Sequence, residues 1–106
     1  MDKNYILKKL AEIDKKEFSI LEIGLFGSYA RGNNTEDSDI DILVKLELKK
    51  GMYQNFCRLQ ETLENIFGRK VDLIEKGTFD YKFKNQEVAK YKEKVKEEIL
   101  GSVIYV

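Results

Sequence analysis

The segment formed by residues 19–46 constrains the fold more than any other part of the chain. Residues 19–26 read SILEIGLF, a short run of branched and aromatic side chains that ends at Gly27-Ser28. Such a run is typical of a mostly buried strand. Residues 32–38 have the composition of a turn, and a second apolar run covers residues 39–46. We therefore expect two strands that are separated by a short connection.

Helices and one further strand are expected outside this segment. Apolar side chains recur at helical spacing in residues 2–15, in residues 52–67 before the C-cap Gly68, and in residues 85–100. Residues 70–75 (KVDLIE) predict a third strand, and the apolar residues 102–106 a closing strand or a docking tail. This order predicts one domain over residues 1–106, of the α/β or α+β class, with a small mixed β-sheet and helices packed on one face.

Composition excludes several classes of function. The chain has 19 Lys and Arg and 19 Asp and Glu, so no overall field attracts nucleic acid or a membrane surface. The absence of histidine removes serine triads and most zinc sites of ordinary type. The single Cys57 cannot form an intramolecular disulfide, and no run approaches the roughly 18 apolar residues of a membrane span. We expect a cytoplasmic protein without a direct nucleic-acid partner.

Asp39 and Asp41 are candidate metal ligands. Successive strand residues point to opposite faces, so these two carboxylates share a face, with Cα atoms about 7 Å apart. A divalent cation would offset their repulsion, and oxygen ligands favour Mg²⁺ or Mn²⁺ over zinc. Asp72 lies alone in an apolar strand and would approach the pair if the two strands were neighbours. Three carboxylates could hold two metal ions about 3.5–4 Å apart, as in phosphoryl or nucleotidyl transfer.

The turn at Gly27-Ser28 supplies candidate contacts for phosphate. Glycine permits close approach of the backbone, serine adds a hydroxyl, and a helix starting near Tyr29 would direct N–H groups at an anion. Arg31 adds a forked positive charge that suits phosphate oxygens. The phosphate contacts would then face the carboxylates.

Together these residues resemble the minimal nucleotidyltransferases of the DNA polymerase β superfamily. The match consists of GSYARG at residues 27–32, SDID at residues 38–41 and VDLI around Asp72, in the order and approximate spacing of that family. The resemblance implies that Asp39 and Asp41 bind both metal ions and that Asp72 completes one metal site and helps to activate the acceptor hydroxyl. It also implies triphosphate contacts from Gly27, Ser28, Arg31 and Ser38.

The resemblance further implies a partner protein. Small members of this group are typically antitoxins that are paired with an all-helical HEPN ribonuclease toxin. The implied reaction transfers AMP from ATP to a hydroxyl of that toxin, with Mg²⁺ as the cofactor. The expected acceptor is the hydroxyl of a tyrosine. No residue of this chain identifies the acceptor.

Simpler interpretations stand beside these. Asp39 and Asp41 could cap a loop at a sheet edge, Gly27-Ser28 could be only a strand-ending turn, and Asp72 could pair with Lys70. Tyr29 and Tyr105 are expected to be packing residues. Two other functions remain open: a binding module that neutralises its partner without turnover, and a small-molecule nucleotidyltransferase, although the acceptor domain of the latter is missing.

Overall fold

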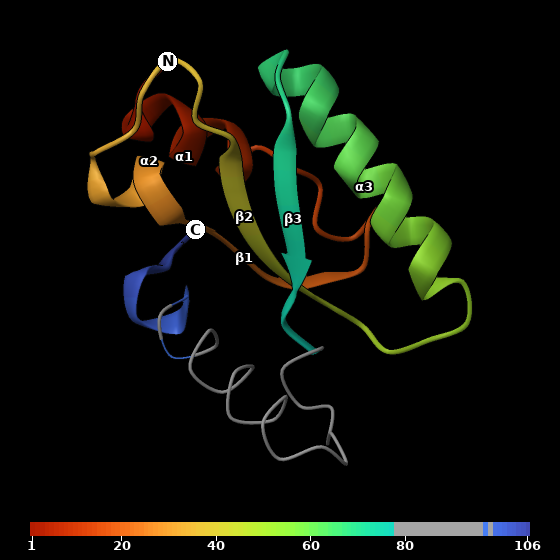
Figure 1. The fold of residues 1–106 in the computed structure, drawn as a ribbon. Helices are drawn as coiled ribbons and strands as arrows, with labels where there is room; N and C mark the ends of the chain where they lie inside the picture. The colour runs from red at the N-terminus through yellow and green to blue at the C-terminus, as the bar shows by residue number, and fades with distance from the viewer. Residues whose placement is uncertain (78–96, 98) are drawn as a thin grey trace, which may run out of the picture.

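The sheet has four strands in the order β3-β2-β1-β4 (Figure 1). The computed structural model describes residues 1–77, 97 and 99–106. The antiparallel pairs are β1 with β2 and β1 with β4, whereas β2 and β3 are parallel. The strands are β1 (Ile20–Phe26), β2 (Ile40–Leu46), β3 (Val71–Glu75) and β4 (Ile104–Tyr105). This is the predicted mixed sheet. The third strand lies beside the second, which is the condition under which Asp72 was expected to approach the other two acids.

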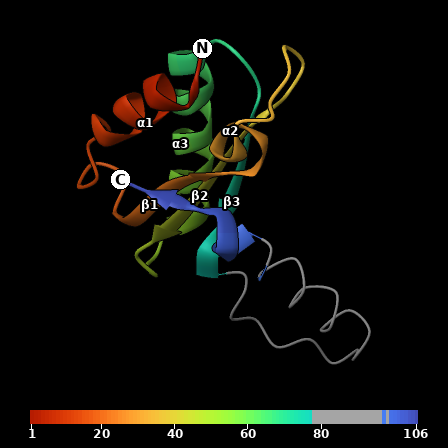
Figure 2. The same ribbon diagram turned by 90° about the vertical axis from the view of Figure 1, so that its left-hand side faces the viewer.

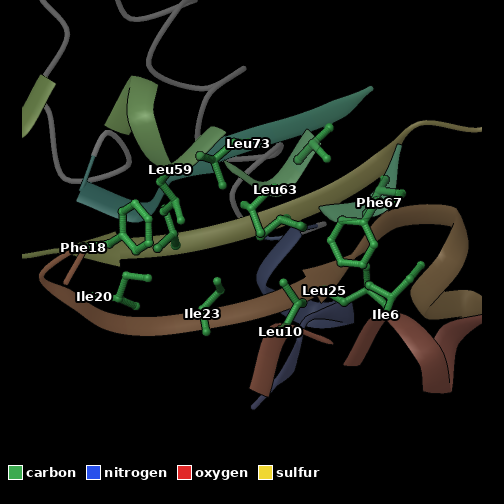
Figure 3. Packing of buried hydrophobic residues seen from close by; sticks show 14 of the residues in the cluster. Ile6, Leu10, Phe18, Ile20, Ile23, Leu25, Leu59, Leu63, Phe67 and Leu73 are labelled. Carbon is green, nitrogen blue, oxygen red and sulfur yellow. The ribbon is translucent and has the colours of Figure 1, made fainter. Parts of the chain in front are cut away.

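The two longer helices, α1 (Lys3–Ala11) and α3 (Met52–Phe67), pack on one face of the sheet (Figure 2). Their apolar stripes meet the alternate side chains of β1 and β2 that point toward them, as Figure 3 shows for Leu10, Leu25 and Leu63. The buried residues of this core come from α1, the following connection, the short helix α2 (Gly27–Arg31), the three longer strands and α3: Ile6, Leu10, Phe18, Ile20, Ile23, Leu25, Tyr29, Ile40, Ile42, Val44, Leu46, Leu59, Leu63, Phe67, Val71 and Leu73.

A smaller apolar cluster lies on the opposite face. Phe26 of β1 and Leu43 of β2 pack there against Ile99, with Leu100 and Val103 beside them. Residues 99–102 are helical and lead into β4. The helix predicted over residues 85–100 falls mostly outside the described residues. The alternative of a closing strand within residues 102–106 is confirmed by β4.

Local hydrogen bonds explain where the observed elements differ from the predicted ones. Helix α1 starts after Asp2, whose Oδ1 accepts from Tyr5 N at 2.9 Å, and stops at Ala11 rather than at residue 15. Asp14 Oδ1 accepts from the backbone N–H groups of Lys16 and Glu17, and this turn competes with the helix. By contrast, α3 has the predicted bounds, and Gly68 closes it in a left-handed conformation.

Glu75 lies on the core-facing side of β3, opposite to Asp72, as the period-2 pattern predicts. Its Oε1 accepts a hydrogen bond from Leu46 N at 3.2 Å. None of the helices among the described residues is long and apolar enough to cross a membrane.

Gly24 allows the C-terminal segment to approach β1 closely. A Cβ atom at this position would lie 2.7 Å from Val103 Cγ1 and 2.8 Å from the Ile104 carbonyl oxygen. We expect Gly24→Ala to lower the free energy of unfolding by about 1–3 kcal/mol, measured by urea denaturation, because the backbone of β4 must move. Gly101→Ala is the control, since its Cβ would meet nothing within 4 Å. Equal stability of the Gly24→Ala variant and the wild type would contradict this account.

Candidate active site

A short helix, α2 (Gly27–Arg31), follows β1 directly and starts the candidate site. Gly27 has φ +74°, and a Cβ atom there would lie 2.1 Å from Asp41 Oδ2. Phe26 is the register partner of Asp41 across the antiparallel β1–β2 pair. The carboxylate of Asp41 therefore rests against the backbone at the start of α2, a position that only glycine can occupy without displacement.

Asp41 and Asp72 are direct register partners on the parallel strands β2 and β3. Their neighbours Ile40, Ile42, Val71 and Leu73 point into the main core, so both carboxylates lie on the opposite face. Asp41 is half-buried and Asp72 is exposed. The structure thus brings together two of the three predicted acids, which are 31 positions apart in the sequence, at the same level of the sheet.

The electrostatic environment acts strongly on Asp41. Partial burial is the largest cause, followed by the negative charges of Asp72 and Asp39, and together these raise the pKa of Asp41 from 3.8 to about 6. Arg31 acts in the opposite direction and lowers this pKa, so its guanidinium is close enough to influence the site. A carboxylate whose pKa is raised by burial and by neighbouring charges is common at catalytic sites.

Asp39 occupies a different position from the other two acids. It lies one residue before β2, is exposed, and its Oδ2 is 3.9 Å from Lys70 Nζ. Among the ion pairs of the described residues, Lys70 therefore pairs with Asp39 rather than with Asp72. Within the described ranges, no three carboxylate or cysteine side chains converge closely enough to hold a metal ion as they stand.

The other predicted residues surround the two central acids. Ser28 is half-buried in α2, and Arg31 is exposed in its last turn. Ser38 Oγ accepts from Thr35 N at 2.8 Å, so this hydroxyl shapes the loop that leads into β2. Nucleotide contacts by Gly27, Ser28, Arg31 and Ser38 stay predictions, as do the roles of the three acids.

Arg69, which contacts both α2 and the 32–38 loop, was not predicted as a site residue from the sequence. The guanidinium of Arg69 donates to the hydroxyl of Tyr29 and to the backbone carbonyl of Glu36. Tyr29 is only 1% exposed, which confirms its predicted packing role. The printed sequence offers no spacing signal for Arg69, because its partners lie 33 and 40 positions away.

Comparison with known proteins agrees with this arrangement. Residues 7–105 match the nucleotidyltransferase domain family. The chain belongs to that family. A Methanocaldococcus jannaschii relative named "Putative protein adenylyltransferase MJ1379" is 49% identical over 72 residues, which cover 67% of this chain and 72% of the relative.

Two solved structures resemble this nucleotidyltransferase. One is described as "Structure of putative minimal nucleotidyltransferase", with a TM-score of 0.70 and 25% identity, and the match covers 98% of this chain and 95% of the other. The second is described as "Crystal structure of the toxin-antitoxin with AMP-PNP", with a TM-score of 0.58 and 22% identity, and the match covers 99% of this chain and 72% of that one. The predicted minimal nucleotidyltransferase fold is confirmed.

The contact between Gly27 and Asp41 can be tested separately from backbone strain. Gly27 and Gly32 both have positive φ, but a Cβ at Gly32 would meet nothing within 4 Å. We expect Gly32→Ala to cost about 1 kcal/mol in unfolding free energy through strain alone. Gly27→Ala should cost clearly more in the same denaturation series, because the Asp41 carboxylate must also move. Equal losses would show that the close approach is unimportant.

The raised pKa of Asp41 predicts a pH-dependent stability. Because the folded-state pKa of about 6 lies above the ordinary value of 3.8, the protonated form is favoured in the folded state, and stability is lost as pH rises through 6. Asp41→Asn should therefore increase the unfolding free energy at pH 7 by on the order of 1 kcal/mol, after allowance for solvent screening.

This gain should disappear near pH 4, where the wild-type carboxyl is neutral in the folded state. Thermal unfolding without added metal, at pH 7 and pH 4, measures both effects. Asp37→Asn in the exposed loop is the control for removal of one negative charge. A lower melting temperature of Asp41→Asn at pH 7 would contradict the prediction.

Proposed function

We propose that this nucleotidyltransferase transfers AMP from ATP to a hydroxyl group of a partner protein. The observation that carries the proposal is the placement of Asp41 between the Gly27 backbone and Asp72. One side of Asp41 offers a backbone turn with a nearby arginine, which suits a triphosphate, and the other offers a second carboxylate. The M. jannaschii relative, which is named as a protein adenylyltransferase, supports a protein acceptor.

Asp41 and Asp72, with Asp39 at the edge of the site, fit a hard divalent cation such as Mg²⁺ or Mn²⁺. All donors are carboxylate oxygens. Burial and the charges of Asp72 and Asp39 raise the pKa of Asp41, and a bound cation would offset the repulsion among these carboxylates. Asp39 would have to exchange its exposed ion pair with Lys70 for the metal, at a small cost. When bound, one or two such ions would neutralise charge on the α-phosphate during transfer of AMP.

Residues of this chain would bind the triphosphate and accept the proton of the acceptor hydroxyl. The backbone at Gly27 and Ser28 and the guanidinium of Arg31 would bind the triphosphate and orient its α-phosphorus. Asp72, exposed on β3, would accept the proton of the incoming hydroxyl. The hydroxyl oxygen then bonds to the α-phosphorus, the bond to the bridging oxygen of the β-phosphate breaks, and pyrophosphate leaves.

We further propose that the acceptor is a tyrosine of a HEPN-type toxin and that transfer neutralises it. The family resemblance of the GSYARG and SDID motifs supports this, as does the fold shared with a chain described as part of a toxin–antitoxin structure with AMP-PNP. In this assignment the chain acts as the antitoxin, with ATP as the donor.

The test uses ATP labelled on the α-phosphate, Mg²⁺, the full chain and a purified HEPN-type toxin from the same genome. Label should move to a toxin tyrosine, identified by mass spectrometry, whereas ATP labelled on the γ-phosphate should give none. Asp41→Asn and Asp72→Asn should each reduce transfer by at least about 100-fold, and Asp37→Asn should not. Chelation of the divalent cation should abolish transfer.

Two outcomes would overturn the proposal. The first is absence of label transfer by the wild type, and the second is undiminished transfer by Asp41→Asn. If relief of toxicity in cells survives Asp39→Asn combined with Asp41→Asn, the chain neutralises its partner by binding alone.

A further inference from the structure

Arg69 joins two parts of the site that approach from different directions. It lies in the turn between α3 and β3, directly after the C-cap Gly68, and is half-buried. Its Nη1 donates to the hydroxyl of Tyr29, its Nη2 donates to the carbonyl of Glu36, and its Cζ lies 5.9 Å from the centre of the Tyr29 ring.

The partners of Arg69 explain why this contact matters. Tyr29 belongs to α2, which also carries Gly27, Ser28 and Arg31. Glu36 belongs to the loop that delivers Ser38 and Asp39 to the start of β2. A single guanidinium therefore connects the proposed phosphate-binding helix with the loop that leads to one of the acids.

The neighbouring residue strengthens the same connection. The carbonyl of Lys70 accepts from Ile40 N at 3.2 Å, which places the end of the loop beside the start of β3. The ion pair of Lys70 with Asp39 is exposed on both sides and adds little. Because Val71 begins β3 and Asp72 follows, the 68–70 turn is in contact with every element that carries a proposed site residue, at the end of the sheet where β2 and β3 begin (Figure 1).

We propose that Arg69 is a positioning residue for nucleotidyl transfer, which holds α2 and the 32–38 loop at a fixed separation through Tyr29 and Glu36. The expected effect on nucleotide affinity rests on the proposed function, whereas the expected effect on the structure of the unliganded protein does not. Only arginine suits the position, because its planar fork can donate to two separate acceptors while it lies over an aromatic ring. Lysine could keep the charge but reach one acceptor at a time.

The chain contains a matched control for the alternative that such contacts merely stabilise the fold. Arg58 of α3 donates through Nη2 to the carbonyl of Glu17 at 3.1 Å, and its Cζ lies 4.8 Å from the centre of the Phe18 ring. It thus makes the same two kinds of contact as Arg69. Apart from Asn55 within α3, its partners lie in the connection between α1 and β1, and none belongs to α2 or the 32–38 loop.

The experiment compares Arg69→Lys, Tyr29→Phe and Arg58→Lys with the wild type, well below their melting temperatures. Hydrogen exchange of the unliganded protein should become faster in residues 28–39 for the first two variants and unchanged there for Arg58→Lys. Affinity for a non-hydrolysable ATP analogue with Mg²⁺ should fall by about 10-fold in Arg69→Lys, and by less in Tyr29→Phe, which keeps the ring. Arg58→Lys should stay within about twofold of the wild type.

The result that would overturn the proposal is unchanged exchange in residues 28–39 of Arg69→Lys, or an affinity loss in Arg58→Lys as large as that in Arg69→Lys. If Arg69→Lys loses thermal stability but keeps normal nucleotide affinity, Arg69 stabilises the fold and does not position the site. If the wild type fails to bind the nucleotide at all, the proposed function is wrong, and the exchange data alone still decide whether Arg69 holds the two segments together.

Discussion

The close approach of Asp41 to the backbone of Gly27 is the constraint on which the rest of the site depends. It requires that β1 and β2 pair so that Phe26 faces Asp41, and that the chain turns into α2 at a residue without a side chain. The register between β2 and β3 then determines that Asp72 is the next neighbour of the same carboxylate. A shift of one residue in either pairing would send an acid into the main core and an isoleucine into the site.

The sheet can maintain this arrangement because one face carries the main core and the other carries the acids beside a smaller apolar cluster. On one face, α1 and α3 bury the alternate apolar residues of β1 and β2 and thereby fix the register. On the other, the smaller cluster of Phe26, Leu43 and Ile99 covers the sheet immediately beside the acids. Burial of apolar area on both sides offsets the cost of the partly buried Asp41 carboxylate beside Asp72 and Asp39, whose pKa is raised by burial and by these two charges. The unfavourable charge arrangement is therefore local, and the stabilising contacts are spread over the domain.

Periodic patterns predicted the parts of this structure that depend on neighbouring residues in the chain. The alternation in residues 39–46 and the helical spacing in residues 52–67 placed β2 and α3 nearly correctly, and the face of Asp72 followed from the same rule. Contacts over long sequence distances were not predictable. Gly24 suits its position because Val103 and Ile104 approach it closely, and Arg69 suits its position because it contacts both Tyr29 and Glu36. Neither reason is visible until the chain is folded.

The different exposure of Asp41 and Asp72 indicates the side from which an acceptor hydroxyl would reach the site. Asp41, on the inner strand β2, is half-buried and backed by Gly27, so it is covered on the side where the triphosphate is proposed to bind. Asp72 is exposed on β3, which is an outer strand among those described. A hydroxyl from another molecule can therefore reach Asp72 without displacing any part of the main core. The donor site would then be built by this chain, whereas the identity of the acceptor would be determined by the surface that docks beside β3.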